Sequence, residues 1–524
     1  MRGQPTGFYY KLGGTTAGAD GLQDLVLVGL ATTSDQGDLR PVLAEAVPSL
    51  ENGNWKLSPD GGMETTWTIR PNARWHDGAP FTAQDLAFTV QLATDRDLPL
   101  RDSIMPFLER GEARDEHTFV AHWKRTFIWA DRLFSTAGSG VTSGQILPLP
   151  RHLLEGPYTE NKETFLGLPY WSDEFVGTGP FVVRELDPDS HAVVAANDQF
   201  ALGRPKIDEI EVKFIPDSNT LVANVLAGVV DLTLSRTVSL EQGADAARRA
   251  PVRMEATPFN LQRLYPQFID PQPAVTGDVR FRQAALLAID RQELIDTLEN
   301  GLTQVPDSIL PPGDTLHREA EVGVAQYPYD PARAAQLLAD LGYTRAADGA
   351  LRSASGERLG SVEIQSQPGD DNQAKVLLAI ADYWQRVGVS VDPVTQPPRQ
   401  DAAISATRRG FWFRGGPNAL LVLPTFVSTE IPRQENGYTG ANVARYASSE
   451  YDALFTRFFS AIPDPERMRS LNLLLRHVTE NLPLIPLYYR VEARIISNRL
   501  IHVAPRALES GPAWDAHRWE VQDQ

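Results

Sequence analysis

The segment from residue 361 to residue 394 constrains the fold more than any other, because it predicts a strand, a helix and a second strand in succession. Val362 and Ile364 alternate within a short strand, and residues 389–394 begin another. The helix between them ends at Gly388 and carries apolar side chains at helical spacing: Ala374, Leu377, Ala381, Trp384 and Val387. Such a crossover within about 35 residues predicts a parallel strand pair with a ligand-prone edge at its carboxyl ends.

The chain divides into a strand-rich part and a later part with longer helices. Its 524 residues exceed the ~250–300 at which a single core stops growing, which predicts at least two lobes. Strands are predicted at residues 65–70, 181–184 and 210–215. Two helices are predicted within 278–301, the second opened by Asp290. Further helices are predicted from Asp330-Pro331 to Gly342 and after Asp464-Pro465. The pattern indicates an α/β protein.

Charge and cysteine content exclude several classes of function. The net charge of −18 argues against nucleic acid as a partner and against an anionic membrane surface. The absence of cysteine excludes disulfides and thiolate metal sites. No apolar run approaches the ~20 residues of a membrane span, and no signal peptide is visible after Met1.

The stretch RWHDGAPFTAQDL, residues 74–86, places a histidine beside an aspartate and a glycine. One interpretation is an acid–base pair, but sequence supplies no nucleophile or orienting carboxylate for His76. The other is architecture, in which Asp77-Gly78 forms a turn and Thr82 caps a helix with Asp85 three residues later. The second interpretation is favoured.

Motifs of catalysis and cofactor binding are not found. The sequence contains no G-x-S-x-G, H-E-x-x-H, Walker A or EF-hand pattern, and its nine histidines are scattered. Residues 177–181 resemble a phosphate loop, but Pro180 removes a backbone N–H that such a loop needs. We therefore expect no catalytic residues, no metal site and no cofactor.

Aromatic residues next to arginines mark a candidate binding surface at residues 408–418, RRGFWFRGGPN. Three consecutive aromatic side chains in a strand cannot all face one core, because alternate side chains point to opposite faces. Either some of these rings line a cleft, or the segment is a buried strand with a single inward face. Residues 8–10 and the polar–aromatic stretch 260–268, with Tyr265, are similar candidates, and such mixtures suit sugars or peptide backbones.

Several motifs, in order along nearly the whole chain, resemble the extracellular solute-binding proteins of family 5, the peptide/nickel/opine class that serves bacterial ABC importers. The matching segments are PVLAE (41–45), TIRP (68–71) with WHDGAPFTAQD (75–85), GTGPF (177–181), AGVVD (227–231), DVRFRQA (278–284), AIDR (288–291), and YDP (329–331) with Leu337-Leu338 and Gly342-Tyr343. Each motif is weak alone, but their order and spacing are specific. In this family the WHDG segment is a scaffold element.

The resemblance implies a two-lobe periplasmic-binding-protein fold of type II, similar to cluster C, with an extra strand-rich subdomain in the first lobe. The first lobe would comprise residues 1–45, 170–255 and 490–524, the extra subdomain 46–169, and the second lobe 256–489. A small solute would be enclosed between the lobes and delivered to a membrane permease.

The aromatic segment departs from the pattern of peptide binders in this family. They usually carry an acidic residue shortly after an aromatic-Gly-Trp element, where it pairs with the α-amino group of the ligand. At that place this chain has Arg414 and no acid, which favours an anionic or highly hydroxylated ligand. The predicted ligand-binding residues are Trp412, Phe411, Phe413, Arg414, Tyr265, Asn418, Tyr10 and Thr15.

The predicted function is therefore the substrate-binding component of an ABC importer, with an oligopeptide or peptide-like molecule, an opine or an oligosaccharide as solute. The resemblance implies a monomer outside the cytoplasm, in the periplasm or as a cell-surface lipoprotein, whose leader is absent from this sequence. The alternative is a hydrolase acting on a peptide or oligosaccharide in the same cleft. A regulatory sensor would require an attached DNA-binding domain, and no basic helix-turn-helix is visible.

Overall fold

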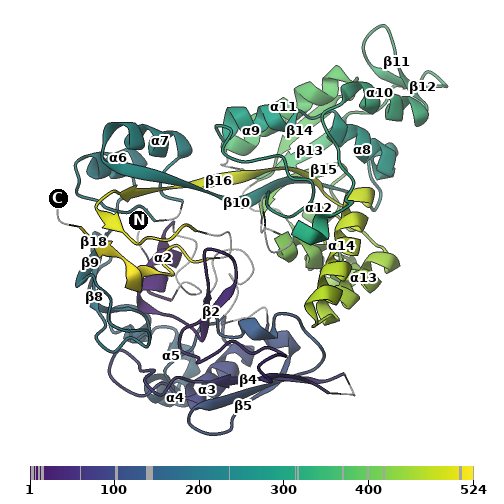
Figure 1. The fold of residues 1–524 in the computed structure, drawn as a ribbon. Helices are drawn as coiled ribbons and strands as arrows, with labels where there is room; N and C mark the ends of the chain where they lie inside the picture. Colours follow the sequence, from purple (N-terminus) through teal and green to yellow (C-terminus); the bar gives the residue numbers. More distant parts are fainter. Residues whose placement is uncertain are drawn as a thin grey trace. The chain divides into compact units, whose positions relative to one another are not determined.

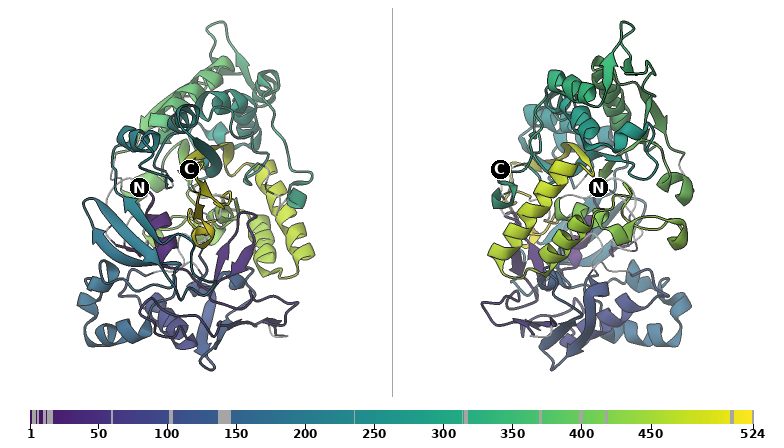
Figure 2. Two further views of the ribbon diagram at one scale, coloured as in Figure 1. Left: turned by 60° about the vertical axis from the view of Figure 1, so that its left-hand side comes forward. Right: turned by 90° about the vertical axis from the view of Figure 1, so that its right-hand side faces the viewer.

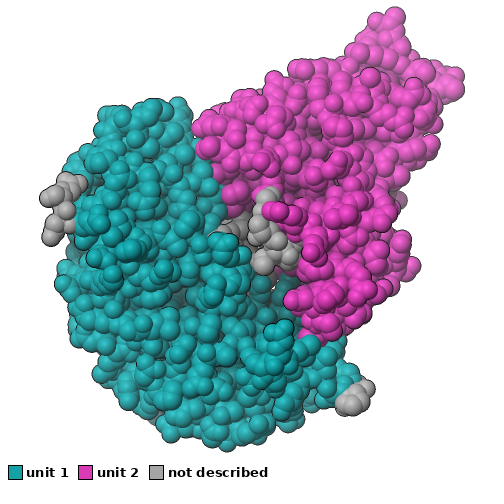
Figure 3. Space-filling model, viewed as in Figure 1, with its two compact units in different colours: residues 1–257, 492–524 teal, residues 258–491 magenta. Residues whose placement is uncertain are grey.

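The chain forms two compact units in the computed structural model. The first comprises residues 1–257 and 492–524, and the second residues 258–491 (Figure 3). The structure describes residues 1, 5, 7–9, 12, 17–58, 61–100, 104–136, 146–234, 236–312, 314, 318–368, 371–397, 401–416, 419–506 and 510–522. No helix in these ranges combines the length and the apolar character needed to cross a membrane.

Unit 1 is built from short helices and several small sheets. Its helices are α2 (Ala19–Val26), α3 (Ala83–Thr94), α4 (Arg151–Glu160), α5 (Lys162–Phe165), α6 (Ser218–Leu226) and α7 (Leu240–Arg249). Its strands are β1 (Ala31–Thr33), β2 (Leu39–Pro41), β3 (Trp55–Leu57), β4 (Met63–Thr68), β5 (Leu108–Ala113), β6 (Thr118–Trp123), β7 (Phe181–Asp187), β8 (His191–Ala196), β9 (Glu209–Lys213), β17 (Leu500–Ile501) and β18 (Glu520–Val521).

The larger sheets of unit 1 have four strands, in the order β3-β4-β6-β5, and three strands, in the order β7-β8-β9. Strands β4, β7 and β9 fall where the sequence predicts strands. In β4 the side chains of Met63, Thr65 and Trp67 are buried while those between them are half-buried, as alternation predicts. Helix α3 begins at Ala83, directly after the predicted cap Thr82, whose backbone N–H donates to Asp85 Oδ2 at 2.8 Å.

Unit 2 combines a five-stranded sheet with helices. Figure 1 labels the strands of this sheet and the helices beside them. The helices are α8 (Val279–Leu287), α9 (Arg291–Leu298), α10 (Pro331–Asp340), α11 (Asp371–Arg386), α12 (Ala402–Ala406), α13 (Ser449–Ser460) and α14 (Asp464–Asn481). The strands are β11 (Tyr343–Arg345), β12 (Leu351–Ser353), β13 (Val362–Ser366), β14 (Val391–Thr395), β15 (Phe411–Gly416) and parts of β10 (Val252–Pro266) and β16 (Ile485–Ser497).

The predicted strand–helix–strand crossover is confirmed. Strands β13 and β14 are parallel neighbours joined through α11, in a sheet of order β14-β13-β15-β10-β16. β15 is parallel to β13 and antiparallel to β10. The predicted helix starts are also present, since Asp290 and Asp330 cap α9 and α10 by accepting backbone N–H groups.

The core of unit 2 lies between this sheet and the helices α8, α9 and α11. Apolar residues of those helices are buried in one cluster with strand residues such as Ile364 and Phe413. Trp384 of α11 is buried there, and its indole Nε1–H donates to the Ala285 carbonyl at 2.9 Å. Helices α13 and α14 lie side by side in the same unit (Figure 2).

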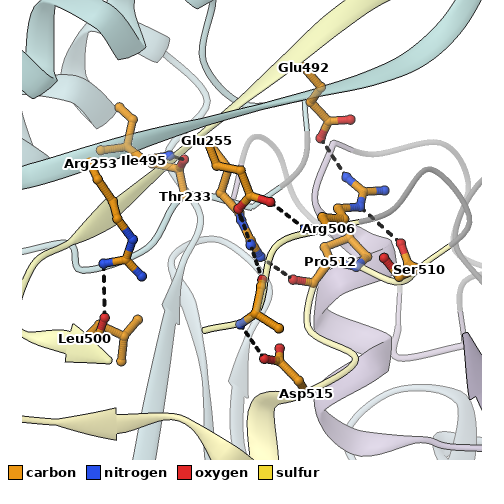
Figure 4. Close-up of polar contacts among 12 residues, drawn as sticks. Thr233, Arg253, Glu255, Glu492, Ile495, Leu500, Arg506, Ser510, Pro512 and Asp515 are labelled. Carbon is orange, nitrogen blue, oxygen red and sulfur yellow. Dashed lines mark hydrogen bonds and ion pairs between the residues drawn. The ribbon is translucent and has the colours of Figure 1, made fainter. Parts of the chain in front are cut away.

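Two strands connect the units, because the boundaries at 257/258 and 491/492 fall inside β10 and β16. Their ends in unit 1 are anchored to the C-terminal segment by buried ion pairs (Figure 4). Arg494 of β16 pairs with Glu255 of β10, and Arg506 pairs with Glu492 at 3.2 Å. Arg494 also donates to the Pro512 carbonyl at 2.9 Å. Both connecting strands are thus fixed to one loop of unit 1.

Candidate functional site

Alternation along β15 separates the three consecutive aromatic residues. Phe411 and Phe413 have no exposed surface and belong to the core of unit 2. Trp412 lies between them in sequence and therefore points to the opposite face of the sheet. The interpretation as a buried strand therefore holds for Phe411 and Phe413, whereas the Trp412 ring lies in a different environment.

The face that carries Trp412 is polar and aromatic. The antiparallel register of β10 and β15 places Tyr265 opposite Trp412 and Arg263 opposite Arg414. Because the side-chain period of a strand is two, these four side chains share one face. A Cβ at Gly416 would lie 2.3 Å from Nη2 of Arg263, so glycine there leaves room for the guanidinium.

Guanidinium groups surround the Trp412 ring. The Cζ atom of Arg414 lies 4.9 Å from the centroid of that ring, and the Cζ atom of Arg408 lies 5.6 Å from it. The Cζ atom of Arg263 lies 5.2 Å from the centroid of the Tyr265 ring. These distances are within the range of cation–π contacts. We call Arg263, Tyr265, Arg408, Trp412 and Arg414 the arginine–aromatic face.

Trp412 is only 9% exposed, and its indole Nε1–H has no acceptor among the described residues. A buried N–H donor without an acceptor costs on the order of 1–3 kcal/mol. The Trp384 indole on the core side of the sheet has its carbonyl partner. The indoles of Trp67 and Trp514 also lack an acceptor among the described residues, but only Trp412 of these three has guanidinium groups recorded over its ring. The arrangement leaves one donor available to an acceptor from a ligand.

Burial perturbs the arginines of this face. Arg408 donates to the carbonyls of Val443 and Tyr265, at 2.6 and 3.3 Å, and burial lowers its pKa to about 9. The pKa of Arg414 is lowered mainly by burial and further by the neighbouring charge of Arg263. Both pKa shifts reflect the cost of keeping a cation away from water. Perturbed pKa values of this kind are common at binding sites.

A chain of amides borders the face on the side of β13. Gln365 stands next to Trp412 in the parallel register, and its Nε2 donates to Glu363 Oε1 at 2.8 Å. The amide oxygen of Gln365 in turn accepts from Gln396 Nε2 at 2.8 Å. These bonds hold Gln365 and engage the nearby carboxylate of Glu363.

The predicted site residues divide into three groups. Trp412, Arg414 and Tyr265 come together on the arginine–aromatic face. Phe411 and Phe413 lie in the core behind it. Three further predicted residues fall outside the described residues: Asn418, Tyr10 and Thr15.

Sequence reasoning missed Arg263, Arg408 and Gln365 as members of this face. Arg408 stands within the quoted arginine–aromatic stretch, so proximity in sequence was an available signal. Arg263 and Gln365 become neighbours only through strand register. The alternation of β10 relative to Tyr265 would have been enough to find Arg263.

His76 joins two segments that are distant in sequence. Its backbone N–H donates to the Gly177 carbonyl at 2.9 Å, its ring Nδ1 accepts the Gly177 N–H at 3.1 Å, and its Nε2 lies 3.1 Å from the Gly179 carbonyl. Burial lowers the pKa of His76 to about 4, so the ring is neutral. These contacts support the interpretation that the WHDG segment is architectural.

The GTGP segment also has a structural role. Thr178 Oγ1 donates to the Val28 carbonyl at 2.7 Å, and the Gly179 N–H donates to the Val26 carbonyl at 3.0 Å. A Cβ at Gly177 would lie 1.9 Å from the Val26 carbonyl oxygen. The glycines therefore permit close backbone approach, in keeping with the sequence argument against a phosphate loop.

A family model described as bacterial extracellular solute-binding proteins, family 5 middle, matches residues 39–474. The oligopeptide-binding protein AppA of Bacillus subtilis is 22% identical over 495 residues, which cover 93% of this chain and 84% of that protein. Heme-binding protein A of Haemophilus influenzae is 25% identical over 490 residues, 88% of this chain and 81% of that protein. The chain belongs to the bacterial extracellular solute-binding proteins of family 5.

Solved structures share the fold. HbpA2 from Haemophilus parasuis aligns with a TM-score of 0.78 and 17% identity, over 99% of this chain and 98% of that one. AppA from Bacillus subtilis, solved with a nonapeptide, aligns with a TM-score of 0.70 and 18% identity, over 100% of this chain and 98% of that one. The predicted α/β periplasmic-binding-protein fold is thus confirmed.

These comparisons assign the general role. The chain is a solute-binding component of an ABC importer, and its family consists of extracytoplasmic, non-enzymatic proteins. The hydrolase alternative finds no support among the relatives.

Proposed function

We propose that the protein binds its solute through the arginine–aromatic face of unit 2, with Trp412, Arg414 and Tyr265 as contacts, for delivery to a membrane permease. The relatives named as oligopeptide-binding and heme-binding support a small solute, and an oligopeptide, a peptide-like molecule, an opine or an oligosaccharide would suit the fold. Phe411 and Phe413 support the site from behind, because they fix β15 in the core.

One observation carries this proposal. A single strand sends two phenylalanines into the core and presents a tryptophan with an unsatisfied buried N–H, flanked by guanidinium groups, on its other face. Nearly all buried polar groups in folded proteins have partners. The pair of guanidinium groups beside its ring distinguishes Trp412 from Trp67 and Trp514, whose indoles also lack an acceptor among the described residues. An acceptor supplied by a solute would satisfy Trp412.

The proposal also keeps the predicted division of the chain. The first lobe would comprise residues 1–45, 170–255 and 490–524, with the subdomain 46–169 inserted, and the second lobe 256–489. The passage of β10 and β16 from one compact unit to the other supports this division. We propose a monomer that solute binding shifts from an open to a closed state, which a permease could recognise.

The test is a Trp412→Phe variant measured with solutes released from the purified protein and identified by mass spectrometry. Phenylalanine keeps an aromatic ring and removes the Nε1–H, so affinity should fall by about 1–2 kcal/mol while the melting temperature changes little. The matched control is Trp384→Phe, which removes a satisfied core indole and should lower the melting temperature with unchanged affinity. Equal affinity for Trp412→Phe and wild type would refute the proposal.

A further inference from the structure

The arginine–aromatic face carries positive charge inside a chain whose net charge is −18. Arg408 is 3% exposed, and Arg414 is half-buried. Neither forms an ion pair within 4 Å with any carboxylate of the described residues, whereas most salt bridges elsewhere in the chain lie on exposed surface. Buried cations without an ion-pair partner are costly, so their concentration here requires an explanation.

The strand register adds to this cost. Arg263 and Arg414 stand directly opposite each other on β10 and β15, and like charges in that position destabilise a sheet. The nearest acid on the β13 side, Glu363, accepts a hydrogen bond from Gln365. Glu363 is thus one carboxylate beside three guanidinium groups, and its charge acts on Arg408 rather than on Arg414. The described part of the face therefore keeps an excess of positive charge, with Arg414 as the guanidinium placed to receive an anion.

We infer that the solute is a small organic anion whose carboxylate is held by Arg414 beside Trp412; this inference rests on the proposed function. A planar guanidinium matches a carboxylate through two parallel N–H···O bonds. The Trp412 Nε1–H supplies a further donor, and the indole offers a flat surface to the rest of the molecule. Burial lowers the pKa of Arg414, so an anion beside it would offset the cost of holding its charge away from water.

The experiment uses pairs of probes that differ in charge but hardly in shape. Citrate, glutarate and isophthalate are compared with citramide, glutaramide and isophthalamide by thermal shift and by calorimetric titration of the full chain. We expect carboxylates to bind and raise the melting temperature, and their amides to leave it unchanged. Arg414→Gln should weaken carboxylate binding about 10- to 100-fold, because it removes a charge-assisted bond.

Arg409→Gln is the matched control. Arg409 is exposed and adjacent to Arg408, so the variant changes the net charge equally without touching the face. We expect its affinity for the carboxylates to match that of wild type. An equal loss in Arg409→Gln and Arg414→Gln would refute a specific carboxylate contact.

The outcomes separate the two proposals. The amides could bind as well as the carboxylates, and Trp412→Phe could weaken binding while Arg414→Gln does not. This result would overturn the anionic solute and leave the proposed binding face intact. No binding by either class would overturn the anionic solute as well. The proposed function would then depend on the Trp412→Phe measurement with the released solutes alone.

Discussion

Substituting His76 by glutamine tests the contact between the WHDG and GTGP segments. In the folded chain the neutral ring accepts the Gly177 N–H at Nδ1 and faces the Gly179 carbonyl through Nε2. Protonation would make Nδ1 a donor facing the Gly177 N–H, which is also a donor. Burial already lowers the pKa of His76 to about 4. Glutamine offers one acceptor and one donor but does not titrate in this range.

The magnitude follows from the pKa shift. The imidazole has a pKa of 6.5 when unperturbed and about 4 in the folded chain, so the unfolded state binds the proton more readily. The stabilisation is therefore complete above about pH 6.5 and is lost as the pH falls toward 4. At about pH 5 the loss amounts to about 2 kcal/mol, with an upper limit of about 3 kcal/mol at lower pH.

The assay is urea unfolding followed by circular dichroism between about pH 7.5 and about pH 5. The quantity of interest is the difference in unfolding free energy between wild type and His76→Gln, because titrations common to both proteins cancel. We expect wild type to lose about 2 kcal/mol relative to the variant across this range. His502→Gln, at a side chain that is 53% exposed, should follow wild type. A pH-independent difference for His76→Gln would refute the role of a neutral, half-buried His76 as the link between the two segments.

Two further substitutions test the backbone contacts and the strand anchors of unit 1. Gly177→Ala should destabilise the chain by several kcal/mol in thermal unfolding, since its Cβ would lie 1.9 Å from the Val26 carbonyl oxygen. Gly167→Ala is the control, because its Cβ would make only an ordinary contact, 3.5 Å from the Thr164 carbonyl oxygen, and should change the stability by less than about 1 kcal/mol. Arg494→Gln should cost about 3–5 kcal/mol by leaving the Glu255 carboxylate buried without its partner, and adding Glu255→Gln should restore part of that loss; a double variant no more stable than Arg494→Gln would refute this account.

Local patterns were sufficient to predict much of the fold. The strand–helix–strand segment appears as β13, α11 and β14 because its strand residues alternate and its helical residues recur every three to four positions. Helix starts at Asp290 and Asp330 follow from side-chain caps, which are local interactions. The position of β15 between β13 and β10 was not predictable, because it depends on pairing between segments about 150 residues apart.

The candidate site shows the same limit. The rule of alternation predicts that Trp412 differs from Phe411 and Phe413, but it does not say which face is the core. That choice depends on the helices that cover the sheet, and in unit 2 the phenylalanines pack toward α11. The partner of Arg414 across the sheet depends on register, which a sequence fixes only after the two strands are paired.

Net charge predicts something about one kind of partner and nothing about the solute. An excess of carboxylates disfavours nucleic acid because that interaction sums over many phosphates along an extended surface. A small solute instead meets the field within about one Debye length, roughly 8–10 Å at physiological ionic strength. The guanidinium groups of Arg408 and Arg414 lie within that distance of the Trp412 ring, so a negative net charge does not argue against an anionic solute there. The sign of the charge at the site therefore has to be read from the side chains that share a face.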